Sequence, residues 1–151
     1  DAADTALYVG IIAGLEVPFM LAVAAYLSRI SKTRLLAFGS LFYPVFLCAF
    51  AVSAAQPWVW ALTIPTAFGA AIILSVPIAY LQDLMANRPG AGGSLLALSN
   101  VMGQIAAAAV FAIGTFFAGY VATAVIAGLV MATAGVTLYI LDARKTVVST
   151  G

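Results

Sequence analysis

One carboxylate stands out because it lies in the middle of a long apolar stretch. Glu16 is flanked by Gly14 and Pro18 in the motif GLEVP. A carboxylate at such depth in a membrane is costly unless it is protonated, paired or facing water, so it marks a functional site by default. Pro18 cannot donate to the Gly14 carbonyl, which leaves a free acceptor one turn away. Glu16 is therefore a candidate substrate ligand or proton carrier. The alternative is a buried polar anchor between helices.

Two amides form a second candidate site. Asn100 and Gln104 are four residues apart in the sequence, so in a helix they lie on one face. Each amide both donates and accepts hydrogen bonds, as a ligand for sugar hydroxyls must. The same side chains could instead bond across to a neighbouring helix. The sequence leaves both interpretations open.

A third group of polar residues follows an apolar stretch directly. Gln82, Asp83 and Arg88 occur in the segment YLQDLMANRPG, which a glycine-rich loop continues. One hypothesis is a gate on the cytoplasmic side. The other is a solvated turn with a surface ion pair, which contributes under about 1 kcal/mol.

The composition defines the scaffold that must position these residues. Of the 151 residues, 65% are hydrophobic and 7% are charged, whereas a soluble domain carries about 25% charged residues. The apolar residues exceed what a single core could hide, so lipid must cover the rest. Uninterrupted apolar runs, rather than strands of about ten alternating residues, predict an all-α, polytopic transmembrane helix bundle.

The length of the apolar runs predicts the number of crossings. A helix needs about 20 mainly apolar residues to cross a bilayer. Five stretches qualify, at residues 5–28, 35–55, 57–81, 94–118 and 119–141. The last two come from one run that is too long for a single crossing. Gly119, beside Tyr120, is the predicted turn, because glycine adopts the backbone angles that a tight reversal needs.

Small and aromatic residues predict contacts and depth. The GxxxG pair of Gly10 and Gly14 and the alanines at 106–109 are typical of closely packed helices. Other small residues expected at close contacts are Ala67, Gly69, Ala70, Ala71, Gly128 and Gly135. Tyr8, Trp58 and Trp60 are expected at the membrane surface, where amphipathic rings gather.

The basic residues predict the orientation, because cytoplasmic loops collect lysine and arginine. All of them follow the first, third or fifth span, and they are Arg29, Lys32, Arg34, Arg88, Arg144 and Lys145. The other side has Asp1 and Asp4 at its start and no basic residue. We therefore expect the N-terminus outside and the C-terminus in the cytoplasm. Because the chain lacks an initiator methionine, we also expect it to be a segment of a longer protein.

Several kinds of chemistry lack their usual residues. The sequence has no histidine, which removes the commonest general base and most transition-metal sites. Cys48 is the single cysteine, and no phosphate-binding GxxxxGK[ST] loop occurs. A net charge of +1 offers no field for nucleic acid. We expect neither an enzyme nor a bound metal or cofactor.

Three segments together resemble a known family. GLEVP at 14–18, AYLSRISKTRLLAFG at 25–39 and YLQDLMANRPGAGGSLLALSNVMGQI at 80–105 are similar to the C-terminal half of bacterial sugar efflux transporters of the major facilitator superfamily. The five spans would match helices eight to twelve of that fold. The chain departs from the superfamily's basic loop at Ala25 and Ser31, where glycines are usual, and in having no acidic residue there.

The resemblance implies a function and a location. It implies proton-coupled export of sugars or glycosides across the bacterial inner membrane by alternating access, with an N-terminal half completing the binding site. Glu16 falls on the family's GLE glutamate, and Gln82, Asp83 and Arg88 fall on its QDLM and RPG elements. Two rivals remain: a multidrug or other small-solute exporter on the same scaffold, and a non-transporting membrane subunit whose polar residues hold a partner helix.

Overall fold

The computed structural model describes residues 2–53 and 55–148, and Asp1 lies outside this range. Helix α1 spans Ala2–Tyr26, α2 spans Lys32–Ser53, α3 spans Thr63–Leu84 and α4 spans Pro89–Val148, while the short 3-10 helix η1, Pro57–Leu62, leads into α3. Five described segments are long and apolar enough to cross a membrane: Ala3–Tyr26, Lys32–Ser53, Pro57–Leu84, Gly90–Phe117 and Gly119–Ala143. The predicted all-α transmembrane bundle of five spans is confirmed.

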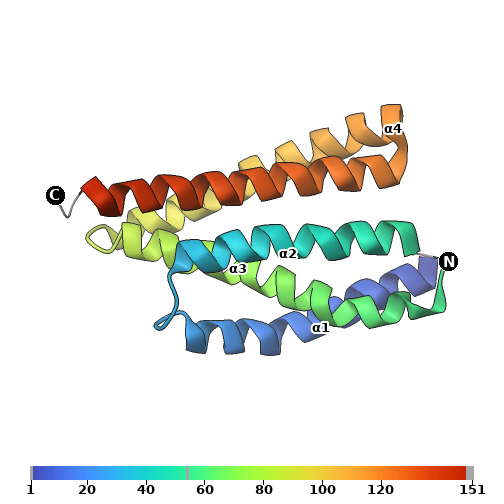
Figure 1. Cartoon of the computed structure of the whole chain (residues 1–151), viewed down its shortest axis with the longest axis horizontal. Helices are drawn as coiled ribbons and strands as arrows, with labels where there is room; N and C mark the ends of the chain where they lie inside the picture. The colour runs from blue at the N-terminus through green and yellow to red at the C-terminus, as the bar shows by residue number, and fades with distance from the viewer. Residues whose placement is uncertain (1, 54, 149–151) are drawn as a thin grey trace.

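Helix α4 is two helices joined by a sharp reversal. Gly119 has φ 75° and ψ 174°, outside the helical region, and it is the break between the two arms. The arms run back along each other in Figure 1. Because an L-residue with a side chain rarely adopts a positive φ, glycine suits this position. The predicted turn at Gly119 is confirmed.

The chain ends and the loops sort into two groups along the bundle. The α1–α2 loop, the α3–α4 loop and the C-terminal end of α4 lie at one end in Figure 1. The start of α1, the α2–η1 junction and the Gly119 turn lie at the other. All basic residues belong to the first group of segments, which we call the basic end. The opposite end is called the acidic end, after Asp4.

The bundle is held by three extensive helix–helix interfaces and a small core. Helix α3 packs against both α1 and α2, and α2 also packs along α4. Val23, Ile72 and Val76 form the buried core where α1 and α3 meet. Since lipid is as apolar as these side chains, close van der Waals packing rather than burial from water stabilises such contacts.

Small residues lie where two helices come closest to each other. Only some of the small residues that the sequence predicted at such contacts are found there. A Cβ on Gly69 would lie 3.0 Å from the Cβ of Tyr43, and one on Gly128 would lie 2.9 Å from the Cβ of Pro44. The other predicted close contacts also hold: Gly135 meets Ser40, and Ala67, Ala70 and Ala71 are buried.

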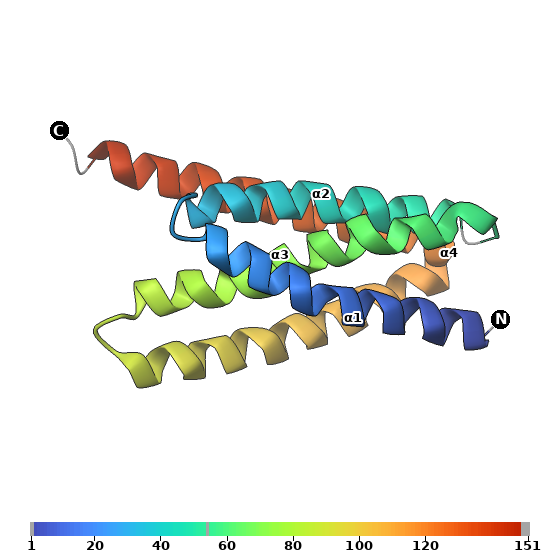
Figure 2. The same cartoon turned by 90° about the horizontal axis from the view of Figure 1, so that it is seen from below.

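Two of the predicted contacts are wrong for this chain. Nothing lies within 4 Å of a Cβ on Gly10 or Gly14, and the alanines at 106–109 are exposed. The reason is the arrangement of the helices. Helix α1 meets α3 through another face, and the most apolar stretch of Gly90–Phe117 has no buried residue. Figure 2 shows this first arm of α4 running along the outside of the bundle.

The outer surface of the bundle is apolar. Leu21, on α1, is 70% exposed, and Phe116, near the end of the first arm of α4, is 82% exposed. Contiguous apolar surface on this scale is not stable in water and indicates contact with lipid or with further membrane helices.

Candidate functional site

Glu16 lies within α1, inside the first membrane span, and its side chain is half-buried. The described residues give its carboxylate no hydrogen bond or ion pair. Tyr43 of α2 lies within electrostatic reach. Such a carboxylate in a span must be protonated, or must face water or a polar group from outside this bundle.

Asn100 and Gln104 lie on the first arm of α4, and both side chains are exposed. Neither has a hydrogen-bond partner within the described part of the chain. Helix α1 packs extensively on α3 and has no extensive interface with α4 among the described residues, so this packing does not bring the amides together with Glu16. The two candidate binding groups remain on separate, uncovered surfaces.

Gln82 and Asp83 occupy the last turn of α3, and Arg88 ends the turn that follows; all three side chains are exposed. The turn is closed by backbone hydrogen bonds from the Met85 amide to the Leu81 carbonyl, 3.0 Å, and from the Arg88 amide to the Met85 carbonyl, 2.8 Å. The Asp83 carboxylate forms an ion pair with Lys32, at the start of α2, rather than with Arg88.

A second polar connection joins the same end of the bundle. The Thr33 hydroxyl donates to the Asp142 carboxylate at 2.9 Å, and Thr33 is also 2.9 Å from the Ser31 hydroxyl. Since the Thr33 proton is directed to Asp142, Ser31 is the donor to Thr33. Thr33 is buried, whereas Asp83 is exposed. The start of α2 is thus tied to the end of α3 through Lys32 and to the end of α4 through Thr33.

These polar groups surround a cavity at the basic end. The cavity has a volume of about 490 Å³, and Lys32, Thr33, Tyr80, Asp83 and Asp142 contribute its polar lining. The sequence pointed to Asp83 but not to Lys32, Thr33 or Asp142 as its neighbours. The sequence held one signal for this arrangement. Asp142 directly follows the last apolar run, and the basic loop after the first span belongs to the same predicted end.

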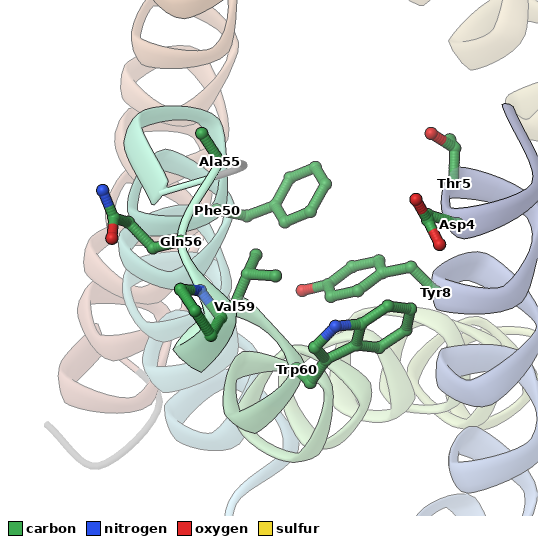
Figure 3. A pocket seen from close by; sticks show the side chains of 9 residues that line it. Asp4, Thr5, Tyr8, Phe50, Ala55, Gln56, Val59 and Trp60 are labelled. Atoms are coloured by element: carbon green, nitrogen blue, oxygen red, sulfur yellow. The ribbon is translucent and has the colours of Figure 1, made fainter. Parts of the chain in front are cut away.

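A different cavity, of about 340 Å³, lies at the acidic end between α1, α2 and η1. Three aromatic rings contribute to it. The Tyr8 ring is stacked with that of Phe50, with centroids 4.4 Å apart, and is tilted by 54° to that of Trp60, with centroids 6.0 Å apart. Figure 3 shows Asp4 and Thr5 of α1 across the cavity from Phe50 and Ala55, with Tyr8 and Trp60 below them.

This cavity corrects one prediction. Tyr8 was expected at the membrane surface, but its side chain is 6% exposed. The ring is covered because α2 and η1 place Phe50 and Trp60 against it. Trp58, 53% exposed, and Trp60, 37% exposed, do lie at the surface of the chain.

A third cavity is almost wholly apolar. It has a volume of about 520 Å³ and lies between α2 and the two arms of α4, near the Gly119 turn. Leu47, Ala107, Phe111, Tyr120 and Ala124 are among its lining residues. None of the described residues that line it is charged, so it suits an apolar molecule or a lipid chain.

The geometry defines a helical membrane protein with polar groups at three levels along the bundle. Comparison of the chain with protein-family models, with characterised proteins and with solved structures finds no match.

Proposed function

We propose that this chain is the C-terminal part of a transporter that exports sugars or glycosides in exchange for protons by alternating access. The observation that carries the proposal is Glu16, a half-buried carboxylate inside a membrane span without a hydrogen bond or ion pair from the described residues. A proton-coupled transporter needs a group that binds a proton while it is open to one side of the membrane and releases the proton while it is open to the other. A carboxylate inside a span can do this. A purely structural carboxylate would have a partner to hold.

The exposed amides support the proposal of a polar path for the cargo, which other helices would complete. Asn100 and Gln104 lie within the span Gly90–Phe117 and have no partner in the described chain. An amide facing hydrocarbon loses its hydrogen bonds, which is unfavourable. Another half of the transporter would cover this face, and the amides would then line the cargo site between the halves.

The contacts at the basic end support the proposal of a gate there. Lys32 with Asp83, and Thr33 with Asp142, tie the ends of α2, α3 and α4 around one cavity. Gln82 and Arg88 lie on the adjoining turn and are exposed. Contacts of this strength can be made and broken at each transport step, since an exposed ion pair contributes under about 1 kcal/mol and a hydrogen bond about 1 kcal/mol.

Each rival function has one observation in its favour. The apolar cavity near Gly119 suits an apolar drug better than a sugar. The exposed amides would equally serve a non-transporting subunit that binds a partner helix. We favour proton-coupled transport because it gives the Glu16 carboxylate a role in each transport cycle, and we favour a polar cargo because the exposed amides of Asn100 and Gln104 can bond sugar hydroxyls.

The test is transport in everted membrane vesicles from cells that express the complete gene encoding this sequence. Labelled disaccharides and alkyl glycosides would be offered with and without an imposed proton gradient. Wild-type uptake should depend on the gradient, Glu16→Gln should lose that dependence, and Glu16→Asp should keep part of it because it retains a carboxylate.

Three results would contradict the proposal. Gradient-driven uptake that survives in Glu16→Gln would make Glu16 a structural anchor. Uptake of apolar cationic dyes but not of sugars would favour the multidrug alternative. If a correctly inserted protein transports neither sugars nor apolar cationic dyes, the non-transporting subunit is favoured.

A further inference from the structure

The apolar cavity near the Gly119 turn lies where the two arms of α4 separate. The arms touch beside the turn, since a Cβ on Gly114 would lie 2.8 Å from the Cγ2 of Thr123. Beyond this contact the arms diverge, as Figure 2 shows, and α2 provides the third wall through Leu47. Alanines line both arms, so short side chains leave the space between them open. They are Ala107, Ala108, Ala124 and Ala127.

The cavity lies at the level of the membrane spans and opens onto the apolar outer surface of the bundle. Its lining residues belong to three spans, Lys32–Ser53, Gly90–Phe117 and Gly119–Ala143. Ala108 and Phe111 line the cavity and are also exposed. The volume of about 520 Å³ is within the range of ordinary ligand sites. An apolar molecule dissolved in the bilayer therefore has access to a space of suitable size.

Water is a poor occupant of this cavity. A buried water needs about two to four polar partners, and only Tyr120 and Thr123 among the described lining residues carry a hydroxyl. The Thr123 proton is already donated to the Gly119 carbonyl, 2.8 Å away. An empty cavity is also unfavourable, because its walls lose dispersion contacts. The occupant that the walls favour is therefore apolar.

The dimensions favour a single alkyl chain over a further helix. A helix is about 10–12 Å in diameter and rises about 5.4 Å per turn, so about one helical turn would fill the whole cavity. The lining residues extend from Tyr120, next to the turn, to Ala107, which lies about 18 Å from Gly119 along the first arm at about 1.5 Å per residue. One leaflet has a hydrocarbon depth of about 15 Å, half of the bilayer core. The cavity therefore has the depth of one leaflet.

We propose that this cavity binds one acyl chain of a membrane lipid, with the headgroup at the acidic end beside Tyr120 and the end of the chain beside Ala107. Tyrosine favours the level of the headgroups, and Tyr120, next to the turn, is 74% exposed. The bound chain completes the packing between α2 and the diverging arms of α4. This site is separate from Glu16, which does not line the cavity, and it does not depend on the proposed transport.

Lipids with a photoreactive diazirine in the acyl chain would locate the chain. The protein encoded by the complete gene would be reconstituted into nanodiscs with one of two probes, which carry the diazirine beside the ester group or at the end of the chain. Illumination followed by peptide mass spectrometry identifies the labelled residues. We expect the first probe to label Tyr120 and the second to label Ala107. At least one of them should label Leu47, on the wall formed by α2.

A matched pair of substitutions separates a bound chain from bulk lipid. Ala108→Leu fills the cavity, whereas Ala109→Leu adds the same atoms at an adjacent exposed alanine that does not line it. Labelling of Leu47 should be lost in Ala108→Leu and unchanged in Ala109→Leu. Ala124→Leu fills the cavity from the second arm, which keeps the test decisive if Ala108→Leu disturbs the first arm. Circular dichroism would establish that each variant is folded.

Three results would overturn the proposal. Labelling of Leu47 that persists in folded Ala108→Leu and Ala124→Leu proteins would place the chain outside the cavity. A parent protein in which neither probe labels Leu47 would show that another part of the protein covers the cavity. Loss of this labelling on addition of apolar cationic dyes would assign the cavity to an apolar cargo. Labelling is measured without transport, so failure of the proposed function would not affect the first two results.

Discussion

The Thr33 hydroxyl donates a hydrogen bond to the Asp142 carboxylate, 2.9 Å away, and so connects the first turn of α2 to the second arm of α4. Thr33 is 4% exposed. Thr33→Val keeps the shape of the side chain and removes the donor, so we expect it to lower the free energy of unfolding by about 1 kcal/mol. Thr33→Ser keeps the hydroxyl and should lose less. Denaturant unfolding in micelles would measure both, and a larger loss in Thr33→Ser than in Thr33→Val would show that the methyl group, not the bond, matters.

The ion pair between Lys32 and Asp83 should matter less for stability than this buried bond. Its side chains are 22% and 67% exposed, respectively. Exposed pairs contribute under about 1 kcal/mol and are screened by salt. We expect Asp83→Asn to change the unfolding free energy by under about 1 kcal/mol, with the difference from the parent protein disappearing at high salt. A double-mutant cycle with Lys32→Gln measures the coupling, and Arg88→Gln should show none with Asp83.

Gly119 and Gly103 offer a matched comparison on α4. A Cβ at either position would meet nothing within 4 Å, but only Gly119 has a positive φ. Gly119→Ala should therefore destabilise the protein by about 1 kcal/mol, through backbone strain alone. Gly103→Ala should be neutral or slightly stabilising, since alanine favours a helix. Thermal unfolding of the two variants measures the difference, and equal midpoints would contradict the assigned turn.

Gly69 and Gly14 allow a comparison between a glycine that is packed against another helix and one that is not. A Cβ on Gly69 would lie 3.0 Å from the Tyr43 Cβ and 3.1 Å from its Cα, which is backbone and cannot move alone. We expect Gly69→Ala to destabilise the α2–α3 contact by about 1–3 kcal/mol. Gly14→Ala, with nothing within 4 Å, should leave unfolding of this chain unchanged. A loss of stability in Gly14→Ala would mean that another helix packs on α1.

The predictions from sequence succeeded where one residue or one segment decides the structure. Apolar length alone defines a span, and the reversal at Gly119 needs only a glycine inside a run that is too long. They failed where the partner is distant in the sequence. Asp83 pairs with Lys32, 51 residues away, and nothing in the local pattern favours Lys32 over Arg88.

Burial was harder to predict for the same reason. Tyrosine is a residue type that favours the membrane surface, but the burial of Tyr8 depends on Phe50 and Trp60, which belong to α2 and η1. The GxxxG pair of Gly10 and Gly14 has the right spacing for helix packing, but spacing does not say which face of α1 meets α3. In a membrane helix all faces are apolar, so hydrophobic periodicity gives no signal for the packed side.

Asn100 and Gln104 give the most direct separation of a ligand site from a helix contact. Both amides are exposed and neither has a hydrogen-bond partner in the described chain. Replacing both by leucine should therefore change the unfolding free energy of this chain by no more than about 0.5 kcal/mol, the usual range for surface positions. Sugar transport in everted vesicles should nevertheless be lost, because leucine cannot bond a sugar hydroxyl. Asn87→Leu serves as the control for removing an exposed amide that has no assigned role in the cargo site or the gate, and we expect it to leave sugar affinity unchanged.

The outcome for the double variant decides between two roles that the sequence left open. If the amides bind cargo, transport falls for sugars while the protein still assembles with its partners, and KM rises in the single variants Asn100→Leu and Gln104→Leu. If they hold a partner helix, crosslinking to that helix is lost together with transport of every cargo, including any that forms no hydrogen bonds. Transport of an apolar substrate is the informative control, since an apolar molecule needs no amide ligand but does need an assembled protein. Retained sugar transport with unchanged KM would remove both residues from the cargo site.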